Sequence, residues 1–196
     1  LIKRWGLKLI IAKNDLALEM GISPLKSGRF NCCNALKTMA LKQTIKRYGF
    51  KALFLAIRRD EHSIRAKERY CSPRDRDFKW DYKNQPLEMW EQFYKSKDED
   101  EIHFRIHPML HWREIDIWRY IKKEGLLVVN LYFAKRGKRY RSIGCECCCE
   151  PMSSSANTID KIIEELEETG ISERAGRAQD KEQAFMMQKL RSLGYM

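Results

Sequence analysis

The chain has 196 residues, 43% hydrophobic and 11% aromatic, which suits one buried domain with a small appendage and excludes a disordered chain. No apolar run reaches the roughly 18 residues of a membrane-spanning helix, and no leader pattern follows residue 1, so we expect a cytoplasmic, reducing location and no membrane partner. The formal net charge of +11 calls for an anionic partner.

The positive charge is concentrated in residues 58–76 and 135–141, whereas residues 98–101 and 164–168 are acidic. A continuous basic face would be typical of a nucleic-acid-binding protein. Separate basic clusters favour local sites for a phosphate- or sulfate-bearing small molecule. We therefore do not expect nucleic acid as the partner.

The first quarter of the chain predicts an α/β arrangement. Residues 7–11 form a short apolar run typical of a buried strand, and residues 21–30, with a proline and a glycine, are expected to form a loop. Residues 34–48 carry one apolar stripe at helical spacing and end at Gly49, and residues 51–57 form a second apolar run. Strand, helix and strand in this order predict a βαβ unit with parallel pairing.

The remaining elements follow a charged stretch. We expect residues 81–101 to wrap the surface, ordered by Trp80, Trp90, Phe93 and Tyr94. Residues 103–109 predict a strand, residues 112–123 a helix ended by Gly125, and residues 126–144 a strand-like run and a basic loop. Asn157 or Thr158 is expected to cap an amphipathic helix, and residues 180–192 predict a last helix.

Three segments outside the cysteines carry candidate anion-binding residues. Arg58, Arg59, Asp60, Arg65 and Lys67 follow a predicted buried strand, the position at which ligands bind in open α/β sheets. Guanidinium groups there can bind phosphate or sulfate oxygens in pairs. The alternative is a solvated helix face of alternating charge.

The other two segments lie later in the chain. Trp112 stands at a helix start, where it is free to stack on a ligand, whereas Trp118 at helical spacing is expected in the core. Arg174 and Arg177 flank Gly176 in a loop that suits an anion, with a merely solvated loop as the alternative.

Six of the seven cysteines form two tight groups. Cys32 and Cys33 are adjacent, and four more lie within residues 145–149, while Cys71 stands apart. In a reducing compartment such groups favour a metal or redox chemistry over disulfides. Buried free thiols remain the alternative.

Ordered motifs link these segments to a known family. They are Tyr48-Gly49-Phe50, Arg58-Arg59-Asp60-Glu61, Arg65-Ala66-Lys67-Glu68-Arg69, Ser72-Pro73-Arg74-Asp75-Arg76, Trp80-Asp81, Lys83-Asn84-Gln85, Trp112-x-Glu114-x-Asp116-Ile117-Trp118, Leu131-Tyr132-Phe133 and Ser172-Glu173-Arg174-Ala175-Gly176-Arg177. In this order, from about residue 36 to the end, the chain resembles the small subunit of bacterial sulfate adenylyltransferase.

The resemblance implies a fold, a reaction and partners. The fold would be adenine-nucleotide α-hydrolase-like (Rossmann-like), a parallel sheet flanked by helices. Residues 1–144 would form a partial nucleotide-binding domain, and residues 145–196 the cysteine cluster and a helical extension. The reaction would be that of a nucleotidyltransferase in sulfate assimilation, which converts ATP and sulfate to adenylyl sulfate and pyrophosphate with Mg²⁺. The partner would be a GTPase large subunit.

Two departures from the family concern the chain's length. The family carries a phosphate-binding loop of the form Ser-x-Gly-Lys-Asp-Ser, which nothing in residues 1–196 matches, so we expect the amino-terminal part of the fold to be incomplete and activity of this chain alone to be in doubt. The family's middle insertion is expected to be shortened here to residues 134–143.

The cysteines are a third departure. Assimilatory adenylyl-sulfate reductases resemble this chain in using Cys-Cys and a distant Cys-x-x-Cys to hold a [4Fe–4S] cluster, which here implies Cys32, Cys33, Cys145 and Cys148 as ligands, with Zn²⁺ as the alternative metal. A reductase of adenylyl sulfate or phosphoadenylyl sulfate is the alternative function. The reductases' carboxyl-terminal Glu-Cys-Gly-Leu-His is missing after Cys149, which counts against that alternative. A tRNA-modifying or nucleic-acid-binding relative is the third possibility.

Overall fold

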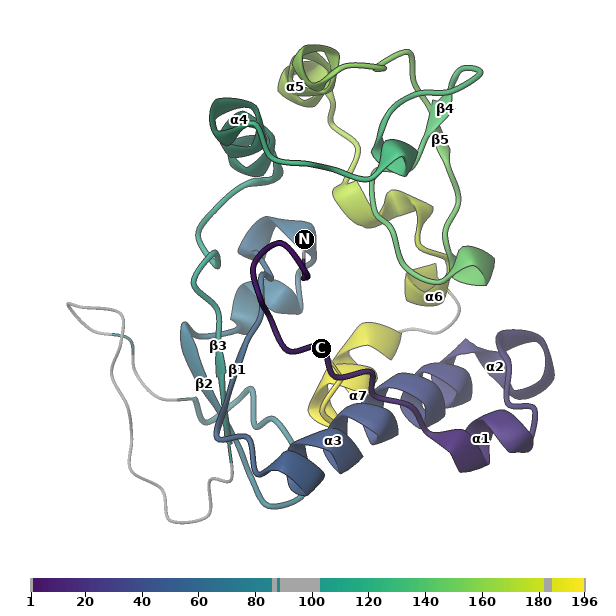
Figure 1. Ribbon diagram of the computed structural model, residues 1–196, viewed down its shortest axis with the longest axis vertical. Helices are drawn as coiled ribbons and strands as arrows, with labels where there is room; N and C mark the ends of the chain where they lie inside the picture. Colours follow the sequence, from purple (N-terminus) through teal and green to yellow (C-terminus); the bar gives the residue numbers. More distant parts are fainter. Residues whose placement is uncertain (1, 86–87, 89–102, 182–184, 196) are drawn as a thin grey trace.

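The computed structural model describes residues 2–85, 88, 103–181 and 185–195 (Figure 1). Trp90, Phe93, Tyr94 and the acidic residues 98–101 lie outside this part of the chain, so the prediction that they order a surface segment concerns residues the structure does not describe. None of the helices in the described part combines the length and apolar character that crossing a membrane requires.

A three-stranded sheet lies at the lower left of the molecule in Figure 1. Its strands β1 (Ala52–Phe54), β2 (Cys71–Arg74) and β3 (His103–Ile106) lie in the order β1-β3-β2. β1 and β3 are parallel, with Ala52 opposite Phe104, and β2 is antiparallel to β3. The predicted strands over 51–57 and 103–109 are thereby confirmed in shortened form. β2 was not predicted.

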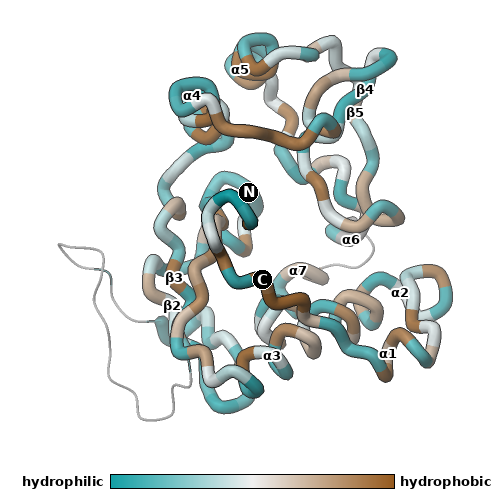
Figure 2. The backbone as a smooth tube through the Cα atoms, viewed as in Figure 1, coloured by the Kyte–Doolittle hydropathy of each residue, from teal (hydrophilic) through white to brown (hydrophobic). Residues whose placement is uncertain are grey.

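The predicted strand over residues 7–11 is wrong. Leu7, Leu9 and Ile11 are 55%, 59% and 70% exposed, and the segment belongs to no described strand. Figure 2 shows it as a brown stretch near the carboxyl terminus, away from the sheet. An apolar run becomes a strand only where another strand offers hydrogen-bonding partners, and none of the described strands lies beside it. The parallel pair of the sheet is therefore β1 with β3 and not a βαβ unit over residues 7–57.

A long helical segment packs beside the sheet. After α1 (Asp15–Glu19), α2 (Pro24–Cys33) continues through a π-helical stretch (Asn34–Met39) into α3 (Ala40–Tyr48). The predicted helix and its left-handed stop at Gly49 are confirmed. The predicted loop over 21–30 is wrong, because Pro24 at the first turn and Ser23 as cap begin a helix there. Gly28, with φ of +75°, marks a kink inside it.

The upper half contains two neighbouring helices, α4 (Glu114–Glu124) and α5 (Ile159–Glu168), whose apolar faces meet. Trp118 and Ile162 are buried between them, which confirms Trp118 as a core residue. Gly125 ends α4 in the left-handed region and Thr158 caps α5, both as predicted. A two-stranded ribbon of β4 (Lys138–Arg139) and β5 (Met152–Ser153) lies beside them.

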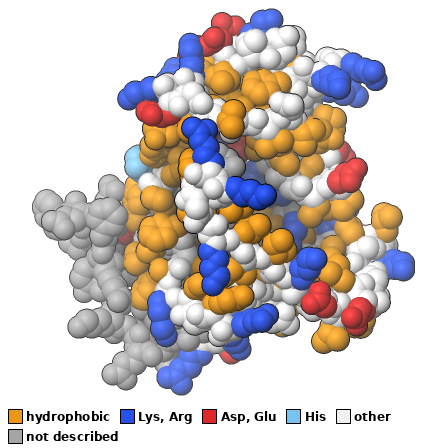
Figure 3. All heavy atoms as spheres, viewed as in Figure 1, with side chains coloured by type: hydrophobic (Ala, Val, Ile, Leu, Met, Phe, Trp, Pro, Cys, Tyr) orange, Lys and Arg blue, Asp and Glu red, His pale blue; other side chains and the backbone are white. Residues whose placement is uncertain are grey.

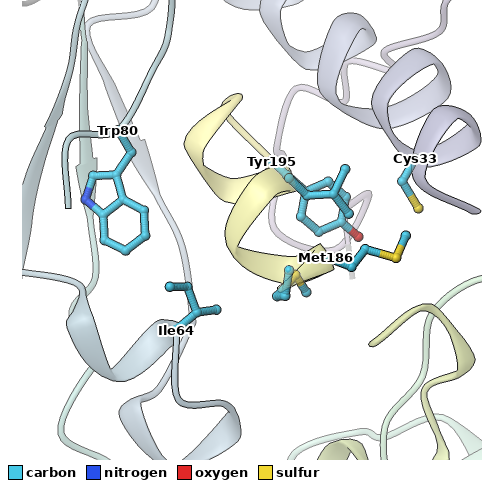
Figure 4. Packing of buried hydrophobic residues seen from close by; sticks show 7 residues of the cluster. Cys33, Ile64, Trp80, Met186 and Tyr195 are labelled. Carbon is cyan, nitrogen blue, oxygen red and sulfur yellow. The ribbon is translucent and has the colours of Figure 1, made fainter. Parts of the chain in front are cut away.

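The carboxyl-terminal segment packs against the first part of the chain. The predicted last helix corresponds to α6 (Ala178–Lys181) and α7 (Met186–Ser192). α7 contributes to a core cluster (Figure 4) that joins distant segments: Cys33, Ile64, Trp80, Met186, Met187, Leu190 and Tyr195. The mixed α/β class is thus confirmed, whereas the division of the chain at residue 144 stays a prediction.

Candidate functional site

Arg58 is the centre of a charge network beyond the end of β1. It is 7% exposed and begins a tight turn, the 3-10 helix Arg59–Glu61. Its guanidinium group donates to Asp60 at 3.0 Å, lies 3.4 Å from a Glu61 oxygen and donates to Glu173. Because Arg58 and Glu61 are buried and the backbone is not a continuous helix, the alternative of a solvated helix face does not describe this segment.

The network joins the three segments that carry the motifs. The Asp60 carboxylate accepts the backbone N–H of Glu114 at 2.6 Å, at the first turn of α4. Glu114 in turn receives two nitrogens of Arg141, at 2.9 and 2.7 Å, and Arg141 donates to the Ile171 carbonyl at 2.6 Å. Segments more than 100 residues apart in the sequence therefore meet at one place.

Burial changes the acid–base properties of this network. It raises the pKa of the Glu173 carboxyl, an effect that Arg58 opposes and Glu114 reinforces. Burial also lowers the pKa of Arg65 to about 9, with Arg174 and Arg191 adding to the effect. Arg65 stays paired with Glu61. The charged side chains of Arg58, Glu61, Arg65 and Glu173 therefore pair with one another, and these ion pairs fix the segment that follows β1.

Two of the nominated cations face solvent. The Arg59 guanidinium lies 5.4 Å from the centroid of the Tyr70 ring and 3.1 Å from Glu88, and its side chain is 38% exposed. The Lys67 ammonium lies 5.3 Å from the centroid of the Tyr82 ring. Aromatic faces hold both cations while leaving part of their surface open to an anion.

Arg174 and Arg177 serve different parts of the molecule. Arg174 forms a two-nitrogen contact with Asp180, at 2.8 and 3.0 Å. Arg177 lies against Gly144, where an added Cβ would stand 2.3 Å from the guanidinium, so only glycine allows this approach. Its Nε is buried and has no hydrogen-bond partner among the described residues. Arg177 also lies within electrostatic range of the Cys33 thiol, whose pKa it lowers against the effect of burial. We therefore count Arg177 among the cations beside the cysteines.

The structure brings the two cysteine groups together. Cys32 and Cys33 are the last two residues of α2, directly before the π-helical stretch. Cys145 immediately precedes the 3-10 helix Glu146–Cys148, and Cys148 is its last residue. Burial raises the pKa of the Cys32 thiol, and Cys145, Cys147 and Cys148 raise it further. Such π-helical stretches are often found at functional sites. The apolar spacing of residues 34–48 predicted a helix but not its π-helical start at Asn34–Met39.

Cations border the thiols. The Lys37 ammonium is hydrogen-bonded to Cys145; although burial lowers the pKa of Lys37, Tyr195 and this contact outweigh burial and raise it. Burial and the Cys147 sulfur, 3.8 Å away, raise the pKa of Cys148 to about 11, an effect that a hydrogen bond from Arg29 opposes. Positive groups of this kind would offset the charge of thiolate ligands.

Thiols of the two segments lie within electrostatic range of one another and beside cations, and thiolates are the ligands that soft metals prefer. The described residues nevertheless contain no group of three or more Cys, His, Asp or Glu side chains already arranged to hold a metal ion. The identity of a metal and its ligands stays a prediction.

Trp112 lies apart from the Arg58 network. With Tyr120, at 5.4 Å between ring centroids, it lines a cavity of about 470 Å³ on the outer face of α4, together with Asp116 and Lys123. Arg58, Arg174 and Arg177 are not among the described residues that line this cavity. Trp112 is thus placed for stacking, as predicted from its position, but its role in nucleotide binding stays a prediction.

Comparison with known proteins identifies the family. Residues 1–151 match the phosphoadenosine phosphosulfate reductase domain. A protein of Shewanella pealeana named sulfate adenylyltransferase subunit 2 is 37% identical over 98% of this chain and 73% of its own length. The chain belongs to the sulfate adenylyltransferase subunit 2 family. Proteins of the same name from Psychromonas ingrahamii and Saccharophagus degradans are 36% and 35% identical, over 98% and 99% of this chain and 73% of their own lengths.

The family assignment confirms the resemblance carried by the ordered motifs, and it favours the adenylyltransferase over the reductase alternative. The alignment to the Shewanella subunit 2 has 222 positions but includes only 98% of the 196 residues here, so about 30 of its positions have no counterpart in this chain. A shortened insertion at residues 134–143 would have this effect, and its location stays a prediction.

Proposed function

We propose that this protein is the subunit of sulfate adenylyltransferase that joins sulfate to ATP. In this reaction a sulfate oxygen attacks the α-phosphorus of ATP, and the bond from that phosphorus to the bridging oxygen of the β-phosphate breaks to release pyrophosphate. The observation that carries the proposal is the similarity to subunit 2 proteins along 98% of the chain. The corresponding fold is Rossmann-like, with the parallel pair β1 and β3 as part of its sheet.

The charge network supports the proposal through its position. Ligands of open α/β sheets bind beyond the carboxyl ends of the strands, where Arg58, Arg59, Asp60, Arg65 and Lys67 lie. The reaction gathers negative charge on the pyrophosphate, and preorganised cations stabilise such charge. We assign this role to Arg59 and Lys67, while the pairs of Arg58 with Glu173 and of Arg65 with Glu61 hold the loop that presents them.

The remaining nominated residues complete the proposed site. Trp112 would stack on the nucleotide, and Arg174 and Arg177 would supply positive charge from the carboxyl-terminal loop. Mg²⁺ would enter with the phosphates of ATP. Residues 1–144 would form part of the nucleotide-binding domain, and residues 145–196 the extension that carries the cysteines. The name of the relatives, subunit 2, supports a larger partner subunit, which we propose to be a GTPase.

Activity tests this proposal directly. The product of the complete gene, assembled with the large subunit, should release pyrophosphate only when ATP and sulfate are both present. Replacing Arg59 by alanine should lower kcat/KM at least about tenfold, because it removes a cation that faces the transferring phosphate.

Lys51→Glu serves as the matched control, since Lys51 is exposed and lies before β1, away from the network. It should leave kcat/KM unchanged. An assembly that releases no sulfate-dependent pyrophosphate would overturn the proposal. Sulfite formation with a thiol donor would instead establish the reductase, and RNA binding with a steep salt dependence the nucleic-acid alternative.

We further propose that Cys32, Cys33, Cys145 and Cys148 hold a [4Fe–4S] cluster with a structural or tuning role. When bound, the cluster would tie the end of α2 to the turn that carries Cys145 and Cys148, with Lys37, Arg29 and Arg177 offsetting its charge. Cys147 and Cys149 would be spare thiols.

Metal analysis decides between the metals. Anaerobically purified protein should be brown and contain about four iron atoms per chain. Cys33→Ser and Cys148→Ser should lose the metal, whereas Cys71→Ser, on β2, should retain it. Colourless protein with zinc would refute the cluster but keep the four-thiolate site, and full iron in Cys33→Ser would refute that ligand set.

A further inference from the structure

A second cavity lies at the β4–β5 ribbon. Its volume is about 520 Å³, in the range of small-ligand sites, and it lies between the 3-10 helix Asn130–Tyr132 and the ribbon. Leu131, Phe133, Tyr140 and Pro151 form its apolar walls. None of the residues nominated for nucleotide, sulfate or metal binding lines it.

The charged side chains that line this cavity are all cationic, and Asn130 is the neutral polar residue beside them. Lys135, Arg136, Lys138 and Arg139 line it, and the described lining contains no carboxylate. Lys135, Arg136 and Lys138 are exposed and form no ion pair with a carboxylate of the described residues. Figure 3 shows Lys and Arg side chains at the corner of the molecule where the ribbon lies. Three uncompensated charges at one opening favour an anion.

The turn that presents these cations has an unfavourable residue. Arg136 and Gly137 both have positive φ, +54° and +76°, between Lys135 and Lys138, which are bridged by backbone hydrogen bonds of 2.8 and 3.2 Å. A two-residue turn of this kind favours Asn or Gly, and arginine is costly at such a φ. Backbone strain of this type is often retained where the side chain has a function.

The buried end of the cavity has an unused donor. Arg139 is 1% exposed, and its Nε and Nη2 donate to Glu165 at 3.1 and 2.6 Å. Its Nη1 is buried and has no hydrogen-bond partner among the described residues. Buried donors without an acceptor are rare and costly, and an anionic oxygen in the cavity would supply the acceptor.

We infer that this cavity binds an organic phosphate or sulfate ester with a flat apolar body. The body would lie between Phe133 and Tyr140, and the anionic group would meet Arg136, Lys138 and the free donor of Arg139. A peptide would need a longer groove than this compact cavity provides. The site is separate from the Arg58 network and does not depend on the proposed reaction.

An NMR titration of the intact chain with phenyl phosphate and phenyl sulfate tests the inference, with phenol and inorganic phosphate as partial probes. At least one ester should bind saturably at one site. Its affinity should be at least about tenfold higher than that of phenol or inorganic phosphate, because only an ester contacts the apolar walls and the cations at the same time. The shifted resonances should fall within residues 130–140. The preference between the two esters distinguishes a phosphate from a sulfate ligand.

Two variants localise the binding. Lys138→Glu should weaken it at least about tenfold, and Arg136→Gly should weaken it while leaving the melting temperature equal or higher, because glycine relieves the turn. Lys51→Glu, a charge reversal outside the cavity, should bind as the parent does. Absence of ester binding, or binding unchanged in both cavity variants, overturns the inference. Loss of large-subunit association in Lys138→Glu without ester binding also overturns it, in favour of a protein-docking surface.

Discussion

Replacing Glu68 by glutamine should lower the free energy of unfolding by about 3–5 kcal/mol, the usual cost of breaking a buried ion pair. Glu68 is fully buried and accepts hydrogen bonds from Arg74, at 2.9 Å, and from Arg191. Glutamine fills the same volume but carries no charge. Two guanidinium groups would then remain in the interior without a counter-ion.

The other groups around these arginines are weaker partners than the Glu68 carboxylate. Arg105 is also buried nearby, and it donates to the backbone carbonyls of Gly194 and Tyr195 instead of to an acid. The guanidinium groups of Arg74 and Arg191 each lie 5.4 Å from the centroid of the Trp80 ring, which contributes a weaker attraction than a charge does. Two buried arginines, Arg74 and Arg191, thus depend on one carboxylate.

Urea denaturation followed by circular dichroism measures the effect. Glu164→Gln, at an exposed position of α5, is the matched control and should stay within about 0.5 kcal/mol of the parent. Adding Arg191→Met to Glu68→Gln should recover part of the loss, because one unpaired charge is removed. A loss below about 1 kcal/mol in Glu68→Gln would show that the interior tolerates the unpaired arginines.

The helices were predictable because their signals are local. An apolar stripe with a glycine stop defined residues 34–48, and the same signals with a threonine cap defined α4 and α5. The start of α2 was missed because residues 21–30 contain both Pro24, which favours a helix start, and Gly28, which breaks one. When one residue favours a helix and a nearby one disfavours it, the local sequence does not decide between helix and loop, and the tertiary contacts of the segment do.

The strands were harder because their partners are distant. Residues 7–11 have the composition of a strand and no described strand beside them. β2 contains a proline and an arginine, and the burial of Arg74 depends on its ion pair with Glu68. The pairing partner and the counter-ion, neither of which the local sequence reveals, decide both cases.

In the candidate site, too, some residues were predicted from local sequence, whereas their distant partners were not. The residue types and their positions predicted the arginine cluster and the two groups of thiols, and the structure brings each together. Asp60 was nominated with the arginines, but the pairing of Arg58 with Glu173 was not predicted, because Glu173 lies 115 residues from Arg58. A buried arginine requires an acid, but the sequence alone does not say which of 27 acidic residues supplies it.

Lowering the pH from 7 to 5 should lower the free energy of unfolding by about 3–4 kcal/mol through two buried histidines. Burial lowers the pKa of His103 to about 4, and Arg105 and Arg74 add to the effect. Burial likewise lowers the pKa of His107 to about 4, against an opposing influence of Glu68. Both side chains are therefore neutral in the folded protein at pH 5, whereas the unfolded chain, with an ordinary pKa near 6.5, binds the protons.

The sign and the window follow from this difference. Stability falls as the pH drops below about 6.5, where the unfolded state begins to take up protons, and levels off near pH 4, where the folded state does so too. Glu68 acts at lower pH: its pKa is held below the usual value by Arg74 and Arg191 despite burial, so its contribution is lost only below about pH 4.5. The histidines thus account for the first loss of stability on acidification.

Urea denaturation at pH 7 and at pH 5 measures this loss. His103 packs against Phe78, with ring centroids 5.1 Å apart, and neither of its nitrogens has a hydrogen-bond partner among the described residues. His103→Gln should therefore remove about half of the pH dependence, roughly 2 kcal/mol, whatever its effect on stability at pH 7. His111→Gln, at an exposed position, is the control and should retain the full dependence. Equal stability of the parent at the two pH values would mean that His103 and His107 can be protonated in the folded interior beside three arginines, which the cost of burying charge argues against.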